Sequence, residues 1–563
     1  MRSRLVTLLS IAAAALALAG TALADSLAII PARPLPGPYV VQCSDLAQDF
    51  SRVAPGAIAQ NYWEGVNGHY IAELLTEPAS TPTANLSLPN DGELFSSFAG
   101  STVVQTLIVC APTAPNNPRP DFALPSGLAI PHMLHAGDSP IWPDATTRFP
   151  LLLFSHGFRG SPISSEYITA LGVFASWGYV VVAPFHGDPR FANLSINDLG
   201  DVAQLLLYFR DYTAMQAVRP LALSAALDVV LSDPNWRDRV DPSRIGAFGA
   251  SLGGEAVMLL AGARLTDSFG LSSKQVILDR RVMGGVGYVP YFGQPFFPSF
   301  GRDQAGVDGV TLPFLAIAGT NDTTAPLVTT RQAMIRLTNT REFVTLAGVT
   351  HGFDIPSTGD IFTWSLQFLD AHVAGDRGAR ATMQRMVQVA GGGTDVLLLD
   401  YNAPAPPIDD ETTVVEYYNA SLNHYFITGF PEEAAALDAG IPPGWRRTGF
   451  EFKAWIRNTA HGLPACRFFG TPGIGPNSHF YTINPDECAL RINDPHWRFE
   501  AIAFNAELPF AEDCPVGHSE VWRLYNNGMG GQANHRFLTS HSEIARMVGE
   551  GWLLEGAVFC TPP

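Results

Sequence analysis

A serine flanked by glycines, Ser251 within residues 249–253 (Gly-Ala-Ser-Leu-Gly), constrains the fold of this chain more than any other feature. It follows residues 244–248, an apolar run typical of a buried strand, and precedes residues 255–264, which are typical of a helix. Glycines two positions either side of the serine permit a turn too sharp for larger side chains, with the serine itself in a strained conformation. The pattern predicts a strand–turn–helix unit that lifts the Ser251 hydroxyl clear of a sheet.

An acid and a histidine follow this turn, each after a predicted strand. Residues 313–318 are a short apolar run, as expected for a parallel strand buried on both faces, and Asp322 comes soon after it. Residues 342–346 form the next predicted strand and lead to His351. In this order the three residues predict a catalytic triad: Ser251 as nucleophile, the histidine as base, and the acid holding the histidine tautomer.

Each member of this triad also has an ordinary structural interpretation. Ser251 could be a turn serine, Asp322 a helix N-cap, and His351 a loop histidine with satisfied hydrogen bonds. Asp354 and Asp360 are alternative acids, but they come after the histidine in the chain. The triad is favoured because all its members occur together, in order and after strands.

A second turn is a candidate for stabilising a negatively charged intermediate. Residues 149–154 predict a buried strand, which the sequence His156-Gly157-Phe158 follows. A glycine-containing turn can aim a backbone N–H at a developing oxyanion. We therefore predict an oxyanion hole made by the N–H groups of Phe158 and Leu252, whereas His156, far ahead of the nucleophile, is expected to be structural.

Such a constellation predicts hydrolysis of a carbonyl substrate through an acyl-enzyme. It requires no metal and no cofactor, and none is expected. The chain has neither an H-E-x-x-H pattern nor a Cys/His cluster with zinc spacing.

Residues 1–24 are typical of a secretory signal, with two arginines, an apolar core and an A-x-A cleavage site at residues 22–24. A membrane anchor is the alternative, but the apolar run is short for a span and no later segment is expected to cross a membrane. Six cysteines, all after this segment, fit an oxidising compartment. We predict a secreted or periplasmic protein.

The cysteines divide into two groups along the chain. Cys43 and Cys110 form the simplest pair in the N-terminal part. The other four allow three connectivities, which the sequence leaves open: Cys466, Cys488, Cys514 and Cys560.

The formal net charge of −18 arises from 34 basic and 52 acidic residues, without a basic run or stripe. Nucleic acids and anionic membrane surfaces are therefore disfavoured as partners. The expected partner is a small or polymeric ester.

The patterns divide the chain into a catalytic part, residues 25–400, a proline-rich linker, residues 401–413, and a β-rich part, residues 414–563. In the catalytic part, strands alternate with helices, which predicts an α/β fold with a mostly parallel sheet. Residues 103–109 are expected at an antiparallel edge of that sheet.

Three similar units, rich in aromatic residues, follow the linker. Each has a histidine at a corresponding place, His424, His479 and His535. Three β-rich units indicate a pseudo-threefold module, with a β-trefoil as one candidate, and a short helix is expected in each unit. The repeated histidines more simply serve packing than a metal site. The aromatic residues either form the core or stack on carbohydrate or a polymer surface.

Residues 288–300 form a loop rich in proline and aromatic residues after another predicted strand, residues 282–287. Because it follows the carboxyl end of a strand, we predict that Tyr288, Tyr291 and Phe292 line the substrate site. The alternative is that these rings pack against their own domain.

Four segments carry a resemblance to a known family: residues 156–158, 249–254, 319–322 with Pro326, and 351–353. Over residues 100–375 the chain resembles the α/β-hydrolase superfamily. Within it, the chain is most similar to the group that contains secreted cutinase-like polyester hydrolases, dienelactone-hydrolase-like esterases and platelet-activating-factor acetylhydrolases.

This resemblance implies the same triad and oxyanion donors. It also implies an esterase, because members of the superfamily more often hydrolyse esters than amides. Dienelactone hydrolases use a cysteine nucleophile, so Ser251 disfavours that activity. Many polyester hydrolases carry a tryptophan where this chain has Tyr288 and Tyr291. The C-terminal part resembles repeat modules of unknown function on secreted bacterial proteins. A peptidase on the same fold, or an inactive protein that binds a surface or polymer, remains an alternative.

Overall fold

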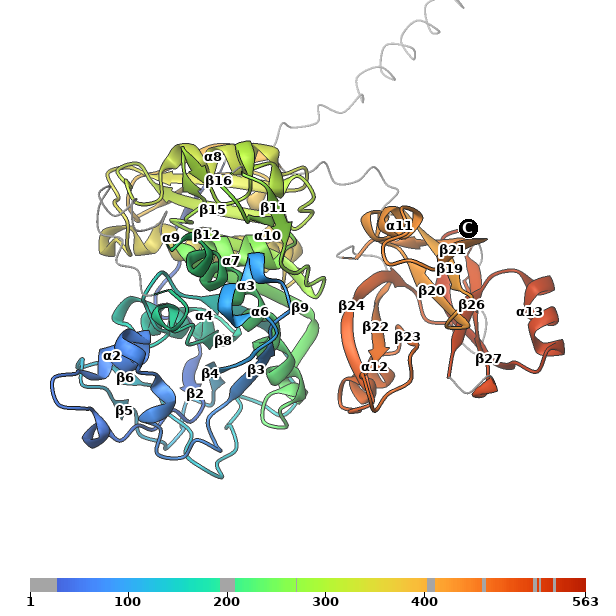
Figure 1. The fold of residues 1–563 in the computed structure, drawn as a ribbon, viewed down its shortest axis with the longest axis horizontal. Helices are drawn as coiled ribbons and strands as arrows, with labels where there is room; N and C mark the ends of the chain where they lie inside the picture. Colours follow the sequence, from blue (N-terminus) through green and yellow to red (C-terminus); the bar gives the residue numbers. More distant parts are fainter. Residues whose placement is uncertain are drawn as a thin grey trace, which may run out of the picture.

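The computed structural model describes residues 28–192, 208–269, 271–401, 411–457, 462–509, 514–515, 518–529 and 533–563. The predicted signal segment and most of the predicted linker lie outside these residues. Figure 1 shows the described strands and helices in two parts, one before residue 402 and one after residue 410.

The first part is built on one large sheet of ten strands. Nine of them follow in the order β18 (Asp395–Tyr401), β16 (Arg341–Leu346), β15 (Phe314–Gly319), β12 (Val282–Tyr288), β9 (Val240–Ala250), β7 (Phe149–Ser155), β8 (Val180–Pro184), β4 (Thr102–Thr113) and β2 (Val40–Cys43). The tenth, β3 (Thr83–Ser87), pairs with β4. The strands from β16 to β8 run parallel, whereas β18 and β4 are antiparallel to their neighbours. The antiparallel strand predicted at residues 103–109 is therefore confirmed, but it is not the edge strand, because β2 and β3 pair with β4 on its outer side.

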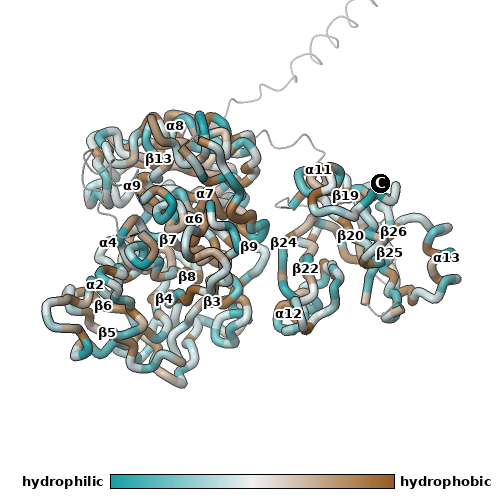
Figure 2. The backbone as a smooth tube through the Cα atoms, in the orientation of Figure 1, coloured by the Kyte–Doolittle hydropathy of each residue, from teal (hydrophilic) through white to brown (hydrophobic). Residues whose placement is uncertain are grey.

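Helices cover both faces of this sheet, as apolar strands buried on two sides require. One face packs against α6 (Phe209–Ser232), α7 (Leu252–Leu260) and α8 (Leu327–Arg336). The other face packs against α4 (Ser165–Ser176), α9 (Thr358–His372) and α10 (Arg377–Met383). Figure 2 shows hydrophobic stretches around α6, α7 and β8 in the middle of this part.

Short elements complete the first part. They are the helices α2 (Ala59–Glu64) and α3 (Gly92–Phe95), and the paired strands β1 (Ala28–Pro31) with β17 (Met386–Ala390), β5 (Phe122–Ala123) with β6 (Ala129–Ile130), β10 (Arg264–Thr266) with β11 (Ser273–Gln275), and β13 (Gly293–Gln294) with β14 (Phe297–Pro298).

Helix α6 corrects one expectation from the sequence. It is long and apolar enough to cross a membrane by length and composition, although no segment after the signal was expected to qualify. In the structure, 72% of its most apolar window is buried inside the protein. The helix is apolar on more than one side because it packs on the sheet while α3 and β3 contact it as well. It is a core helix of this part of the chain.

Three disulfides connect the six cysteines. Cys43–Cys110 joins β2 to β4, which confirms the predicted pair. The four later cysteines pair as Cys466–Cys488 and Cys514–Cys560. Three disulfides are consistent with an extracellular or periplasmic protein.

The second part, which we call the module, contains three units of two strands, a helix and a third strand. They are β19 (Glu411–Asn419), β20 (His424–Thr428), α11 (Pro431–Asp438) and β21 (Trp445–Trp455); β22 (Leu463–Gly470), β23 (His479–Thr482), α12 (Pro485–Ile492) and β24 (Trp497–Ala506); and β25 (Ser519–Tyr525), β26 (His535–Leu538), α13 (His541–Gly549) and β27 (Leu553–Thr561). The predicted threefold repeat and its short helices are confirmed.

The β-trefoil candidate does not match this arrangement. A β-trefoil needs a closed barrel, but the described strands of the module form open antiparallel sheets of six and three strands. In each unit, one segment between the second and third strands forms a helix, so only three strands remain for the unit's own sheet.

Two of the three repeated histidines pack against the neighbouring unit. The ring of His479 in the second unit lies 4.6 Å from that of Phe426 in the first, and His535 in the third lies 5.0 Å from Phe480 in the second. These contacts agree with the packing interpretation of the repeated histidines.

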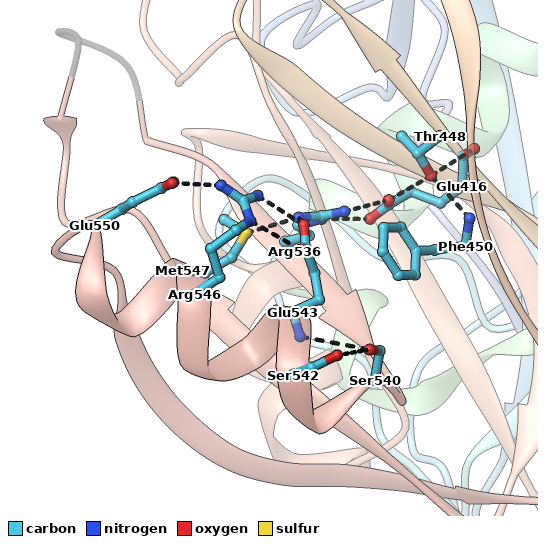
Figure 3. Close-up of polar contacts among 10 residues, drawn as sticks. All are labelled: Glu416, Thr448, Phe450, Arg536, Ser540, Ser542, Glu543, Arg546, Met547 and Glu550. Atoms are coloured by element: carbon cyan, nitrogen blue, oxygen red, sulfur yellow. Dashed lines mark hydrogen bonds and ion pairs between the residues drawn. The ribbon is translucent and has the colours of Figure 1, made fainter.

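Ion pairs also join each unit to the next. Arg467 of the second unit lies 2.8 Å from Glu433 of the first, and Arg523 of the third lies 3.2 Å from Glu487 of the second. The third unit returns to the first with the charges reversed, because Arg536 donates two hydrogen bonds of 2.8 Å to Glu416 (Figure 3). The three units are thereby linked in a ring.

Breaking the buried Arg536–Glu416 pair is expected to destabilise the module strongly. Both side chains are only 2% exposed, so Arg536→Met would leave the Glu416 carboxylate buried without its partner. We expect a loss of about 3–5 kcal/mol in the free energy of unfolding, measured by hydrogen exchange of β19 and β26 in urea.

The matched control is Arg447→Met, which removes a pair with Asp438 whose side chains are 46% and 42% exposed. That change should cost about 1 kcal/mol or less. Equal losses in the two variants would show that the buried pair contributes no more to the free energy of unfolding than the exposed pair.

The module contacts the large sheet at the amino ends of the parallel strands. Arg280, just before β12, pairs over 2.8 Å with Glu432 of α11. A groove nearby is lined by Ser243, close to the start of β9, and by Pro464 of β22. Ser251 follows the carboxyl end of β9, so the module and Ser251 lie at opposite ends of the parallel strands.

Candidate active site

The predicted sharp turn is present between β9 and α7. Ser251 has φ +54° and ψ −120°, a conformation that non-glycine residues rarely adopt. A Cβ atom on Gly249 would lie 2.1 Å from the Gly253 carbonyl oxygen, and one on Gly253 would lie 2.0 Å from the Ser155 carbonyl oxygen. Only glycine fits at these two positions, which explains the spacing of the motif.

The structure brings the three predicted triad residues into one hydrogen-bonded chain. The Ser251 hydroxyl lies 2.8 Å from Nε2 of His351, and Nδ1 of that histidine lies 2.8 Å from Oδ2 of Asp322. The Asp322 side chain is fully buried. Its other oxygen, Oδ1, accepts the N–H groups of Thr324 (2.9 Å) and Ala325 (2.8 Å), so both carboxyl oxygens are held.

Two neighbouring turns hold the acid and the histidine together. The turn after β15 donates from Thr320 N to Leu346 O and from Asn321 N to Val349 O, each over 3.0 Å. The alternative acids are engaged elsewhere. Asp354 accepts hydrogen bonds from Ser357, and Asp360 accepts one from the Gly393 N–H. Asp322 is therefore the partner of His351.

Both predicted oxyanion donors belong to segments next to Ser251. Leu252 is the first residue of α7, and a Cβ atom on Gly157, next to Phe158, would lie 3.4 Å from the Ser251 Cβ. The N–H groups of Gly157, Arg159 and Gly160 all donate to protein acceptors. Within the described residues, neither the Phe158 nor the Leu252 N–H does so.

His156 has the structural role expected of it. It is fully buried, and its Nε2 accepts the His186 N–H over 3.2 Å while Nδ1 lies 2.8 Å from Gly157 O. Burial, with the nearby charge of Arg219, lowers the pKa of His156 to about 3. The ring is therefore neutral and lacks a free nitrogen to act as a base.

The predicted substrate contact is wrong for Tyr288 and Phe292. Both side chains are fully buried. The Tyr288 hydroxyl donates to Gly352 O over 2.6 Å, and the Phe292 ring packs beside Phe300. Their apolar rings serve the core, as the alternative interpretation had it.

Tyr291 belongs to the same loop and is only partly buried. Its backbone N–H donates to the Ser251 carbonyl oxygen over 2.9 Å, and the Ser251 N–H donates to Tyr288 O over 2.9 Å. The loop thus braces the backbone of the nucleophile turn, and substrate contact by the Tyr291 side chain stays a prediction.

Polar residues of α6 and α7 were missed by the sequence analysis. Glu255, one turn after Ser251, is completely buried, and Gln216 Nε2 donates to its Oε1 over 2.7 Å. Arg219, one turn further along α6, is buried as well. Polar residues inside an otherwise apolar helix were the signal that could have identified them.

Burial raises the pKa of Glu255 to about 7. Between its ordinary value of 4.5 and pH 7 the folded protein holds a proton there that the unfolded chain has lost. The free energy of unfolding should therefore fall as pH rises through this range, by up to about 3 kcal/mol.

Glu255→Gln is expected to remove this part of the pH dependence and to raise stability at pH 8, because the amide stays neutral. Urea unfolding of the variant and the wild type at pH 5 and pH 8 measures the difference. An unchanged pH dependence in the variant would contradict a proton on folded Glu255.

Comparison with known proteins concerns the module. Residues 413–562 match a family described as a domain of unknown function (DUF5648). None of the curated proteins matches the chain. The family match covers the three repeated units, and the residues of the candidate site lie outside it.

Proposed function

We propose that this chain is a secreted serine hydrolase that cleaves carboxylic esters through an acyl-enzyme. One observation carries the proposal: the unbroken Ser251–His351–Asp322 chain, with bonds of 2.8 Å at both steps, on a strained turn. A hydrogen-bonded chain that only stabilised a loop would not require a serine in a strained backbone conformation.

The architecture supports membership of the α/β-hydrolase superfamily. The three residues follow the carboxyl ends of β9, β15 and β16, the edge at which open α/β sheets bind their ligands. An order of serine, acid and histidine along the chain is the one expected of that superfamily.

The roles follow from the hydrogen bonds. His351 Nε2 takes the Ser251 proton as the oxygen attacks the substrate carbonyl, and Asp322 stabilises the resulting imidazolium. The N–H groups of Phe158 and Leu252, which have no acceptor within the described residues, are suited to bind the oxyanion. The protonated histidine then gives its proton to the leaving alcohol. In the second half of the reaction the histidine takes a proton from water, which attacks the acyl-enzyme, and the proton then returns to the Ser251 oxygen as the acid is released.

Access to solvent supports a substrate that approaches from outside. Ser251 retains 9% of its exposure and the His351 side chain retains 25%. A small or polymeric ester fits this reading, and the module is proposed to contact a surface or carbohydrate. A nucleic acid is not proposed as a partner.

Hydrolysis of p-nitrophenyl esters from acetyl to palmitoyl tests the proposal, together with a fluorophosphonate label located by mass spectrometry. We expect turnover and a label on Ser251, and the chain-length profile distinguishes an esterase from a lipase. Cleavage of peptide anilides in preference to esters would favour the peptidase. If the protein shows no turnover of any substrate and no label on Ser251, an inactive, surface-binding protein is favoured.

A further inference from the structure

A buried arginine lies beneath the loop that carries the Phe158 N–H. Arg219 comes from the middle of α6 and Asp188 from the segment after β8, and both side chains are 1% exposed. Nε and Nη2 of Arg219 donate to the two carboxyl oxygens of Asp188 over 2.9 and 2.6 Å. A buried pair of this kind is a costly way to gain stability alone, so its remaining contacts indicate its use.

Besides a long bond of 3.4 Å from Nη1 to the Ser155 hydroxyl, the remaining contacts of Arg219 go to the backbone of the loop. Arg219 Nη1 donates to His156 O over 2.6 Å, and Nη2 donates to Gly157 O over 3.1 Å. Oδ2 of Asp188 accepts the Arg159 N–H over 2.8 Å. The ion pair thus holds the carbonyl just before the Phe158 N–H and the amide just after this residue.

Holding the Gly157 carbonyl fixes the direction of the Phe158 N–H. The two groups belong to one peptide unit, and in a trans peptide they point in opposite directions. With the carbonyl turned toward Arg219, the N–H is turned away from it. The N–H is the one donor of residues 157–160 without a protein acceptor within the described residues.

The same carbonyl is unusually well supplied with donors. Besides Arg219, it accepts the Gly160 N–H over 3.2 Å and a bond of 2.8 Å from His156 Nδ1. Nδ1 carries the hydrogen because Nε2 of that ring accepts the His186 N–H. Three donors on one carbonyl polarise the peptide, which makes its N–H a stronger donor.

We propose that Arg219 is a positioning residue for the oxyanion hole. Together with Asp188 it sets the direction and the donor strength of the Phe158 N–H without touching the substrate. The inference rests on the proposed function, since an oxyanion forms only when Ser251 attacks a carbonyl.

Arg281 provides a matched control in the same part of the protein. It is also buried, and it makes a forked pair with Asp279 and further bonds to Asp228 and Ser224. None of these partners belongs to the candidate site. Loss of a buried guanidinium can therefore be compared with and without a connection to the loop.

The experiment compares Arg219→Lys, Asp188→Asn and Arg281→Lys with the wild type. For each we would measure kcat and KM on a p-nitrophenyl ester, and the melting temperature. We expect Arg219→Lys and Asp188→Asn to lower kcat by about 10²–10³-fold, as for loss of an oxyanion donor, with KM nearly unchanged. Arg281→Lys should lower the melting temperature while kcat stays within about threefold of the wild type, because its partners lie outside the site.

A second measurement separates positioning from folding. The ratio of rates on an ester and its thionoester reports hydrogen bonding to the oxyanion, because sulfur is a weak acceptor. This ratio should fall in Arg219→Lys and stay constant in Arg281→Lys.

Two outcomes would overturn the inference while the proposed function stands. One is an Arg219→Lys protein with wild-type kcat. The other is a loss of kcat that is equal in Arg281→Lys and follows the melting temperature. If the wild type itself neither turns over esters nor labels at Ser251, the proposed function fails and the inference fails with it.

Discussion

Replacing Ser251 with alanine should lower kcat on p-nitrophenyl esters by about 10⁴-fold or more. In the proposed mechanism the Ser251 hydroxyl oxygen is the atom that His351 activates and that forms the acyl-enzyme, so no neighbouring group replaces it. Residual activity should remain above the rate in water, because the oxyanion donors and the binding surface are intact. The fluorophosphonate label should be lost completely.

The strained turn makes this variant a clean test. Ser251→Ala keeps the Cβ atom and the backbone, and the bonds from Ser251 N to Tyr288 O and from Tyr291 N to Ser251 O are main-chain contacts. Folding should therefore be retained. Ser165→Ala, on an exposed serine at the start of α4, serves as the control and should react as the wild type does. A Ser251→Ala protein with more than a tenth of wild-type kcat would refute the triad.

Replacing Asp322 with asparagine should cost about 10⁴-fold in kcat, for a reason specific to this site. Oδ1 of Asp322 accepts two backbone N–H groups, from Thr324 and Ala325. An asparagine would keep its carbonyl oxygen there, which turns its NH₂ group toward His351. Nδ1 of the histidine must then accept, so the proton moves to Nε2, and Nε2 can no longer take the Ser251 proton.

Steady-state kinetics on the same ester measure this loss, with Asp354→Asn as the control. Asp354 bonds to Ser357 and not to His351, so its variant should stay within a few-fold of the wild type. Activity of Asp322→Asn within tenfold of the wild type would mean that the carboxylate does not set the tautomer.

The sequence allowed the triad to be predicted because each member follows a strand that is recognisable by itself. Runs of apolar residues identified the strands before Ser251, Asp322 and His351, and parallel strands bring their carboxyl ends to one edge. The oxyanion candidates were predicted from the glycines in two turns. Those glycines are required by local steric constraints, which a sequence pattern reveals. The positions of the triad residues in the structure agree with these predictions.

Features that depend on distant pairing were not predictable in this way. Asp188 and Arg219 come from different elements, and nothing in either local pattern shows that they meet under the loop. The burial of Tyr288 and Phe292 depends on what packs over them, which a loop composition does not reveal. Glu416 stands where the other units have arginine, but its partner Arg536 becomes evident only once the three units form a ring.

The position of the module also bears on how such a protein could work at an interface. The module contacts the amino ends of the parallel strands, and Ser251 lies at their carboxyl ends. A molecule held on a solid support by its module would point its reactive serine into the surrounding liquid. If the proposed function holds, the module would keep the esterase close to a source of diffusing esters. Cleavage of the support itself would require the two parts to change their relative orientation.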